Sequence, residues 1–192
     1  LEKDKVRIVP MTLGGGFGAK YGIYDSLAGA LALTLKQTIK LTLSRSEDFQ
    51  STTPSPNTKI FLKTGATREG TLTALQARIE VDSGIFGFPL ASLFVSLIGG
   101  YYKIENTFIE CFEVNTNKPQ VGAYRAPAAP QITFALESNI DELAQQMGLE
   151  PLEFRYKNAV ETGDLMGNNE PWPHLGLKQC LEELRQHPAW KN

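Results

Sequence analysis

Apolar and polar residues alternate strictly in two stretches of the chain, residues 59–64 and 75–82. Alternation with a period of two is typical of a strand that buries one face and exposes the other. Glu69-Gly70 lies between the two stretches, so we expect an antiparallel hairpin with one solvated face. Residues 108–114 form another run of strand length, which predicts a further strand.

A helical period dominates the second half of the chain. The apolar residues that share one face of its most regular helix are Leu136, Ile140, Leu143, Ala144 and Met147. Gly148 is expected to end this helix and Pro151 to begin the next. Shorter helices are expected over residues 90–98 and around residues 177–184. Helices interspersed with a mixed or antiparallel sheet indicate an α+β fold.

The N-terminal part is organised around a glycine-rich turn, Gly14-Gly15-Gly16-Phe17-Gly18-Ala19-Lys20. A β-branched run precedes it at residues 6–10, an Ala- and Leu-rich segment follows at 23–36, and residues 39–43 alternate again. This order predicts a strand, a turn, a helix and a second strand. Glycines leave backbone amides bare, and amides at a helix N-terminus suit an anion. Phe17, between two glycines, either plugs the core or forms a wall beside a ligand.

A second candidate segment runs from Val121 to Gln131 and is rich in small residues and prolines. Its Arg125 is a permanent charge whose guanidinium offers forked donors to an anion, while its small neighbours allow close approach to the backbone. An arginine that is merely exposed is the alternative. Gln131 is expected to cap the helix that follows.

Composition excludes several classes of function. The chain has 192 residues and a formal net charge of −2 without a basic block, so we expect no nucleic-acid partner. The uncharged stretch 84–102 is interrupted by Pro89 and Gly99, which favours a short buried helix over a membrane span. Cys111 and Cys180 are far apart and exclude a cysteine-ligated zinc or iron–sulfur site within this chain. Such sparse cysteines are typical of a reducing compartment, and we expect a cytoplasmic protein.

No nucleophile stands beside a base in a recognisable pattern. His174 and His187 are the only histidines, and neither has a partner at metal-ligand spacing. Glu47 and Asp48 are adjacent after a predicted strand, where they would point to opposite faces, so a paired acid–base role is not expected. Any catalysis is therefore expected to depend on a cofactor, with no metal ligand from this chain.

One cofactor interpretation is a dinucleotide such as NADP. Gly14-x-Gly16-x-x-Ala19 lies between a predicted strand and a predicted helix, and Arg45 could contact a 2′-phosphate. A dinucleotide-binding fold continues with alternating strands and helices, whereas residues 58–116 predict antiparallel strands. NADP binding therefore stays as an alternative.

Four segments in order carry a resemblance to a known family. They are the glycine turn with the run before it, Tyr102-Lys103-Ile104-Glu105-Asn106, Gly122 to Gln131, and Asp141-Glu142-Leu143-Ala144 followed by Pro151 to Asn158. Together they resemble the molybdopterin-binding large subunit of the xanthine dehydrogenase/aldehyde oxidase family, over nearly all of residues 6–185. The resemblance implies one molybdopterin-binding domain fragment, residues 1–192, whose parent chain extends on both sides.

The resemblance also implies a function, that of a molybdenum hydroxylase that oxidises an aldehyde or N-heterocycle with oxygen derived from water. The residues expected to bind the molybdenum cofactor are Gly15, Gly16, Phe17, Gly18, Ala123, Tyr124 and Arg125. Of these, Phe17 and Arg125 are expected closest to the chemistry and are the catalytic candidates. Iron–sulfur and FAD groups are expected on partner domains or subunits of an oligomeric enzyme.

Several positions depart from the pattern of particular members. Tyr21, Leu93 and Pro127 stand in the expected substrate pocket where purine hydroxylases place a glutamate, an arginine and a stacking phenylalanine, so xanthine is not the expected substrate. Ala126 replaces the cysteine of carbon monoxide dehydrogenases, so no copper–molybdenum site is expected. The family's catalytic glutamate belongs to a segment outside these residues. The alternatives are an isolated cofactor-binding domain without turnover and a domain kept as an assembly surface.

Overall fold

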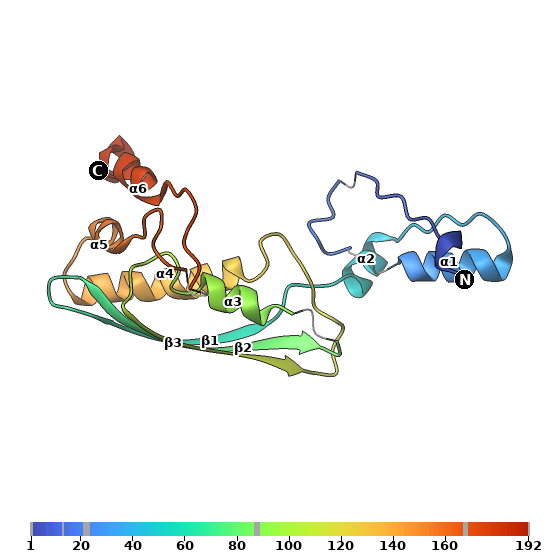
Figure 1. The fold of residues 1–192 in the computed structure, drawn as a ribbon, viewed down its shortest axis with the longest axis horizontal. Coiled ribbons are helices and arrows are strands. Elements are labelled where there is room, and N and C mark those ends of the chain that lie inside the picture. The colour runs from blue at the N-terminus through green and yellow to red at the C-terminus, as the bar shows by residue number, and fades with distance from the viewer. Residues whose placement is uncertain (1, 13, 21–23, 87–88, 167–168, 192) are drawn as a thin grey trace.

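A computed structural model describes residues 2–12, 14–20, 24–86, 89–166 and 169–191 (Figure 1). In chain order its elements are η1 (Lys3–Lys5), α1 (Asp25–Leu35), α2 (Arg45–Ser51), β1 (Thr58–Ala66), β2 (Leu72–Gly84), α3 (Ala91–Leu97), β3 (Asn106–Asn115), α4 (Ala129–Gln146), α5 (Pro151–Asn158), α6 (Leu177–Gln186) and α7 (Pro188–Lys191). The α+β class predicted from the sequence is confirmed.

The sheet has three strands in the order β1-β2-β3, so β2 is the central strand. β1 and β2 form the predicted antiparallel hairpin, in which Ile60 pairs with Ile79. β3 lies parallel to β2 on its other side, so the prediction of antiparallel strands throughout residues 58–116 is wrong for β3. A parallel pair needs a crossover connection, and α3 lies within it. The sheet is therefore mixed.

The hydrophobic core lies between the sheet and the helices that cover one of its faces (Figure 1). On β2 the alternating residues Leu75, Ala77, Ile79 and Val81 are buried, whereas Arg78 between them is exposed. The period of two in the sequence thus becomes one buried and one solvated face.

Two helices provide the other side of the core. α3 is the expected short buried helix, since Leu90, Phe94 and Ile98 in and around it are fully buried. α4 is longer than the predicted helix because it already begins at Ala129, with Pro130 in its first turn, where the missing N–H of proline is not needed. The buried side chains of α4 follow helical spacing and are Ile132, Leu136, Ile140 and Ala144.

A polar network joins α4 and α5 to the segment between α3 and β3. Tyr102 donates its hydroxyl to both carboxylate oxygens of Glu137 at 2.8 Å, and burial raises the pKa of Tyr102, which keeps it a neutral donor. Arg155 binds Glu137 at 2.8 Å and Asp141 at 2.6 Å. Asn158 accepts from the first amide of β2 at 2.8 Å. Tyr102, Asp141, Arg155 and Asn158 belong to segments that carry the family resemblance, and here they hold the fold together.

The described residues up to Ser51 form an N-terminal arm that extends beyond one end of the sheet (Figure 1). None of these described residues is buried. α1 forms within the predicted range 23–36, of which residue 23 lies outside the described part. Strands were expected at residues 6–10 and 39–43, but neither segment is a strand. A strand needs a neighbour for its backbone hydrogen bonds, and no described segment pairs with these two.

The C-terminal helices lie at the other end of the molecule from the arm (Figure 1). α6 is the helix expected around residues 177–184, and its Arg185 donates to Glu153 on α5 at 2.6 Å. α7 follows it directly. Within the described ranges, no helix combines the length and apolar character needed to cross a bilayer.

Candidate functional site

The glycine loop, residues 14–20, is an exposed turn that depends on left-handed backbone conformations. Gly18 has φ +88°, and Phe17 has φ +49°, which is uncommon for a bulky residue. The Ala19 N–H donates to the Gly16 carbonyl at 2.9 Å and closes the turn. Phe17 remains 55% exposed, so it does not plug the core and is free to form a wall beside a ligand.

The helix expected to begin at this turn starts only at Asp25, after residues 21–23, which lie outside the described part. Asp25 lies within the predicted range 23–36, so the helix itself is confirmed, and the loop supplies backbone donors of its own. A Cβ added at Gly14, Gly15 or Gly16 would meet nothing within 4 Å. The space beside these three residues is thus open to a ligand.

The arginine loop, residues 122–128, meets the glycine loop through its backbone. The Arg125 N–H donates to the Phe17 carbonyl at 2.8 Å. The ring centroids of Tyr124 and Phe17 are 6.4 Å apart, and the rings are tilted by 45°. Two segments more than 100 residues apart in the sequence, both predicted to bind the cofactor, are therefore brought together.

The close approach of the two loops requires unusual backbone on both sides. A Cβ at Gly18 would lie 3.2 Å from the Cβ of Ala123, so a larger residue would push the loops apart. In the arginine loop, Ala126 and Ala128 have φ +55° and +69°. Non-glycine residues in this region are strained and are found at functional sites. The Arg125 side chain is exposed, and no carboxylate of the described residues pairs with it.

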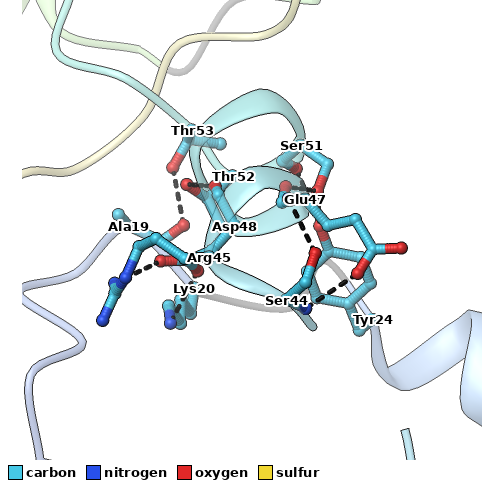
Figure 2. Close-up of polar contacts among 10 residues, drawn as sticks. All are labelled: Ala19, Lys20, Tyr24, Ser44, Arg45, Glu47, Asp48, Ser51, Thr52 and Thr53. Carbon is cyan, nitrogen blue, oxygen red and sulfur yellow. Dashed lines mark hydrogen bonds and ion pairs between the residues drawn. The ribbon is translucent and has the colours of Figure 1, made fainter. Parts of the chain in front are cut away.

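α2 lies beside the glycine loop, as Figure 2 shows. Its start is a capping box in which Ser44 Oγ accepts from the Glu47 N–H at 3.3 Å and Glu47 accepts from the Ser44 N–H at 2.7 Å. One turn on, the Asp48 carboxylate pairs with Lys20 at 2.7 Å and with Arg45 at 3.2 Å. The hydrogen bond from Lys20 lowers the pKa of Asp48, which keeps the carboxylate charged. Glu47 and Asp48 are thus engaged separately and are no acid–base pair.

The segment Thr52–Ser55, here called the bridge, connects α2 to the sheet and contacts both loops. Thr53 donates from its N–H and its Oγ1 to the Ala19 carbonyl, at 3.3 and 3.1 Å (Figure 2). The Pro54 carbonyl accepts from the Gly122 N–H at 3.1 Å. The bridge is therefore bonded to the glycine loop on one side and to the arginine loop on the other.

The bridge is also bonded to α4. Gln131 was expected to cap this helix, but its Nε2 donates to Ser55 Oγ at 2.8 Å instead, because α4 already begins at Ala129. Gly122 is needed at its position, since a Cβ there would lie 2.7 Å from the side chain of Thr53.

A hollow of about 440 Å³ lies between the glycine loop, α2 and the arginine loop. Its lining includes Gly15, Gly16, Phe17, Lys20, Arg45, Asp48 and Tyr124. The lining holds two cations and one carboxylate, which gives it a positive excess, and it also includes the aromatic rings of Phe17, Phe49 and Tyr124 and the backbone of the glycine loop. This combination suits a planar, anionic ligand.

The predicted substrate-pocket residues are divided among different parts of the molecule. Tyr21 lies outside the described residues. Pro127 is partly buried within the arginine loop, two residues after Arg125. Leu93 is 37% exposed on α3, which packs against β3 and α4. Its grouping with Pro127 in one pocket stays a prediction.

The dinucleotide alternative fails on topology. The fingerprint requires a strand that enters the glycine turn and pairs in a parallel sheet. Residues 6–10 form no strand, and the strand pairs are an antiparallel β1–β2 and a parallel β2–β3.

Sequence reasoning missed α2 and the bridge, although one signal was present. Ser44-Arg45-Ser46-Glu47 has the spacing of a capping box, which marks the start of a helix. The short helix lacks an apolar periodic face, so hydrophobic spacing alone did not indicate it.

Comparison with known proteins shows the family of this chain. The sequence matches the molybdopterin cofactor-binding domain family over residues 1–159. It is 35% identical over 196 residues to a xanthine dehydrogenase-type protein of Bacillus subtilis (strain 168), across 100% of this chain and 26% of that protein. It is 31% identical over 189 residues to the aldehyde oxidoreductase of Megalodesulfovibrio gigas, across 96% of this chain and 21% of that protein.

Solved structures show the same fold. The aldehyde oxidoreductase from Desulfovibrio gigas superimposes with a TM-score of 0.84 at 29% identity, over 93% of this chain and 20% of that chain. Quinoline 2-oxidoreductase from Pseudomonas putida 86 gives a TM-score of 0.82 at 27% identity, over 93% of this chain and 25% of that chain. The chain thus spans about a quarter of the length of such relatives. It belongs to the molybdopterin cofactor-binding domain family of the xanthine dehydrogenase and aldehyde oxidoreductase type.

Proposed function

We propose that this chain forms two walls of the molybdopterin site in a molybdenum hydroxylase that oxidises an aldehyde or an N-heterocycle. The observation that carries the proposal is the hydrogen bond from the Arg125 N–H to the Phe17 carbonyl, which joins the glycine and arginine loops at 2.8 Å. We further propose that residues 1–192 act as one molybdopterin-binding unit of a longer parent.

The residues present fit an anionic pterin. Open space adjoins Gly14 to Gly16, where no Cβ would meet a neighbour. The adjacent hollow of about 440 Å³ is bordered by Lys20 and Arg45 with only Asp48 to balance them. Arg125 adds an unpaired cation among the described residues at the same junction. Bare amides and cations are the groups that bind phosphate and oxyanions in proteins.

Each loop has a distinct task in this proposal. The amides of Gly15, Gly16 and Gly18 bind the cofactor, and the rings of Phe17 and Tyr124 exclude water from its edge. The small side chain of Ala123 lets the arginine loop approach the glycine loop, and Arg125 binds an anionic group. The cofactor, when bound, supplies the two-electron redox chemistry for which no side chain of this chain is suited.

The proposed substrate class follows from the apolar residues at the predicted pocket positions. Leu93 and Pro127 offer neither charge nor hydrogen-bond donor to a purine, which favours an aldehyde or a less polar heterocycle. Two similar proteins are named for an aldehyde and for quinoline. The assignment of Tyr21 to this pocket remains part of the proposal.

We also propose partners that carry iron–sulfur and flavin groups within an oligomeric enzyme. Electrons released from the substrate need acceptors, and none of this chain's own side chains is one. A relative from Paenarthrobacter nicotinovorans is named as one subunit of a dehydrogenase complex. Both cysteines are free thiols, which supports a cytoplasmic location.

Metal analysis and one substitution test the proposal in the intact parent protein. We expect molybdenum in the parent, and Arg125→Ala should lower kcat/KM for the best aldehyde or heterocycle by roughly 100-fold, as for loss of a charged site donor. Arg68→Ala, which removes an exposed arginine from the distant β1–β2 turn, is the matched control and should change nothing. A parent without molybdenum in a molybdenum-replete host, or an unaffected Arg125→Ala variant, would contradict the proposal.

A second candidate function is cofactor binding without turnover by these 192 residues alone. The observation that favours it is the coverage of about a quarter of the relatives' length. Molybdenum that copurifies with the isolated chain, without oxidation of any tested aldehyde or heterocycle, would support this function. Molybdenum in the parent but not in the isolated chain would exclude it.

A further inference from the structure

We propose that α2 and the bridge set the spacing between the glycine loop and the arginine loop, with Asp48 and Thr53 as positioning residues. The inference rests on the proposed function, because spacing between these loops matters only if both contact one ligand. Both residues also line the hollow beside the two loops. Each acts through a neighbour in the glycine loop.

Thr53 binds the glycine loop at the carbonyl of Ala19, the residue before the ion-paired Lys20. Both its N–H and its Oγ1 donate to the Ala19 carbonyl, at 3.3 and 3.1 Å. The Ala19 N–H in turn donates to Gly16 at 2.9 Å. One residue of the bridge therefore fixes the end of the turn that presents Phe17.

The same part of the bridge holds the arginine loop. The Pro54 carbonyl accepts from the Gly122 N–H at 3.1 Å. The side chain of Thr53 fills the space that a Cβ of Gly122 would need, with 2.7 Å between them. Thr53 and Pro54 thus contact both loops, and their placement determines how the loops meet at the bond between Phe17 and Arg125.

Asp48 fixes the bridge and the glycine loop to α2. The Asp48 carbonyl accepts from Thr52 Oγ1 at 2.7 Å and from the Thr52 N–H at 3.3 Å, which ends the helix and starts the bridge. Its carboxylate pairs with Lys20 at 2.7 Å, directly after Ala19 in the chain (Figure 2). The Asp48 side chain is only 17% exposed, while Lys20 and Arg45 are more exposed around it. The carboxylate therefore holds the lysine onto the helix.

Amide hydrogen exchange of the 192-residue chain tests the inference without any cofactor. Asp48→Asn keeps the side-chain shape but removes the ion pair, and Thr53→Val keeps the shape but removes the hydroxyl donor. We expect each to speed exchange of the Ala19 and Arg125 amides by roughly tenfold relative to amides of β2, as for loss of local protection. Thr53→Ser keeps the hydroxyl and should restore protection. Glu47→Gln removes a neighbouring negative charge but can still form the capping box, so it should behave as wild type.

The intact enzyme provides the second readout. Asp48→Asn and Thr53→Val should retain molybdenum and lower kcat by roughly tenfold, since misplacement by about 1 Å is costly in catalysis. KM should change less, and Thr53→Ser should recover activity. A parent that lacks molybdenum overturns the proposed function, whereas the exchange experiment still decides whether the bridge positions the loops.

Two results overturn the inference alone. One is that the Ala19 and Arg125 amides are as protected in both variants as in the wild type, and that both variants of the molybdenum-containing enzyme are fully active. This result counts when Arg125→Ala impairs the same enzyme. The other is a uniform rise in exchange over β2 and the loops alike, because this would indicate a general loss of stability and no local positioning role.

Discussion

α1 in the N-terminal arm and α4 over the sheet are both helices rich in apolar residues, yet they differ in burial. α4 has one apolar face, and that face is buried against the sheet and α3. α1 has apolar residues on most of its faces, and none of its residues is buried. A helix that is apolar all round is typical of the interior of a large protein. Both segments are helical, but among the described residues α4 packs its apolar face against the sheet and α3, whereas α1 buries no residue.

The polar contacts of the two regions differ in the same way. In the sheet and the helices packed on it, here called the body (the described residues from 58 on), Tyr102, Glu137 and Arg155 form a partly buried network. In the arm, Tyr24 donates to the Ser51 carbonyl at 3.0 Å in an exposed setting. Water competes with exposed bonds, so the arm is expected to open at a lower free energy than the body.

The largest contrast is expected for one apolar truncation in each region. Ile79→Ala in β2 removes a fully buried side chain and should lower the free energy of unfolding by about 3 kcal/mol. Leu33→Ala in α1, where the side chain is 55% exposed, should change it by about 0.5 kcal/mol or less. Denaturant unfolding followed by circular dichroism measures both. Equal losses would show that the arm contributes to the same cooperative core.

A smaller contrast is expected for two tyrosine hydroxyls. Tyr102→Phe removes a donor to the Glu137 carboxylate and should cost about 2 kcal/mol, because this bond is charge-assisted and shielded. Tyr24→Phe removes an exposed bond and should cost about 0.5 kcal/mol or less. The same unfolding experiment compares the two. A greater effect at Tyr24 would contradict the division of the molecule into body and arm.

The smallest expected effect is a dependence of folding stability on acidic pH. Bonds from Lys118, Thr116 and the Gly84 amide lower the pKa of Asp82 to about 2, below the unfolded value of about 3.9. Because the folded pKa is the lower one, the stabilisation is fully present above about pH 4 and is lost as the pH falls toward 2. Asp82→Asn should therefore flatten the stability profile of the body in this window.

The arm provides the control for this acid effect. The pKa of Asp48 is also lowered, chiefly by Lys20, but its contacts lie in the arm and not in the core. Asp48→Asn should leave the acid profile of β2 unfolding unchanged. An equal flattening by both variants would show that arm and body unfold together.

The fold could be predicted from the sequence where apolar and polar side chains occupy separate faces of a strand or helix. Leu75, Ala77, Ile79 and Val81 repeat at two residues, and the buried face of α4 repeats at helical spacing, so the sequence contains the burial directly. The β-branched run at residues 6–10 and the alternating run at 39–43 were also expected to be strands, but neither forms one. A strand's hydrogen bonds depend on a partner that its own sequence does not encode.

For the candidate site, the sequence by itself determined the two loops. The three glycines of one loop and the small residues around the arginine of the other permit close backbone approach independently of the rest of the fold. Tertiary structure alone decided that Phe17 and Arg125 share a hydrogen bond and that Thr53 lies between their loops. It also decided that Tyr102, Asp141 and Arg155 serve the fold. The physical reason is that hydrogen bonds over long sequence separation depend on how helices and sheet are packed, and no local pattern specifies that packing.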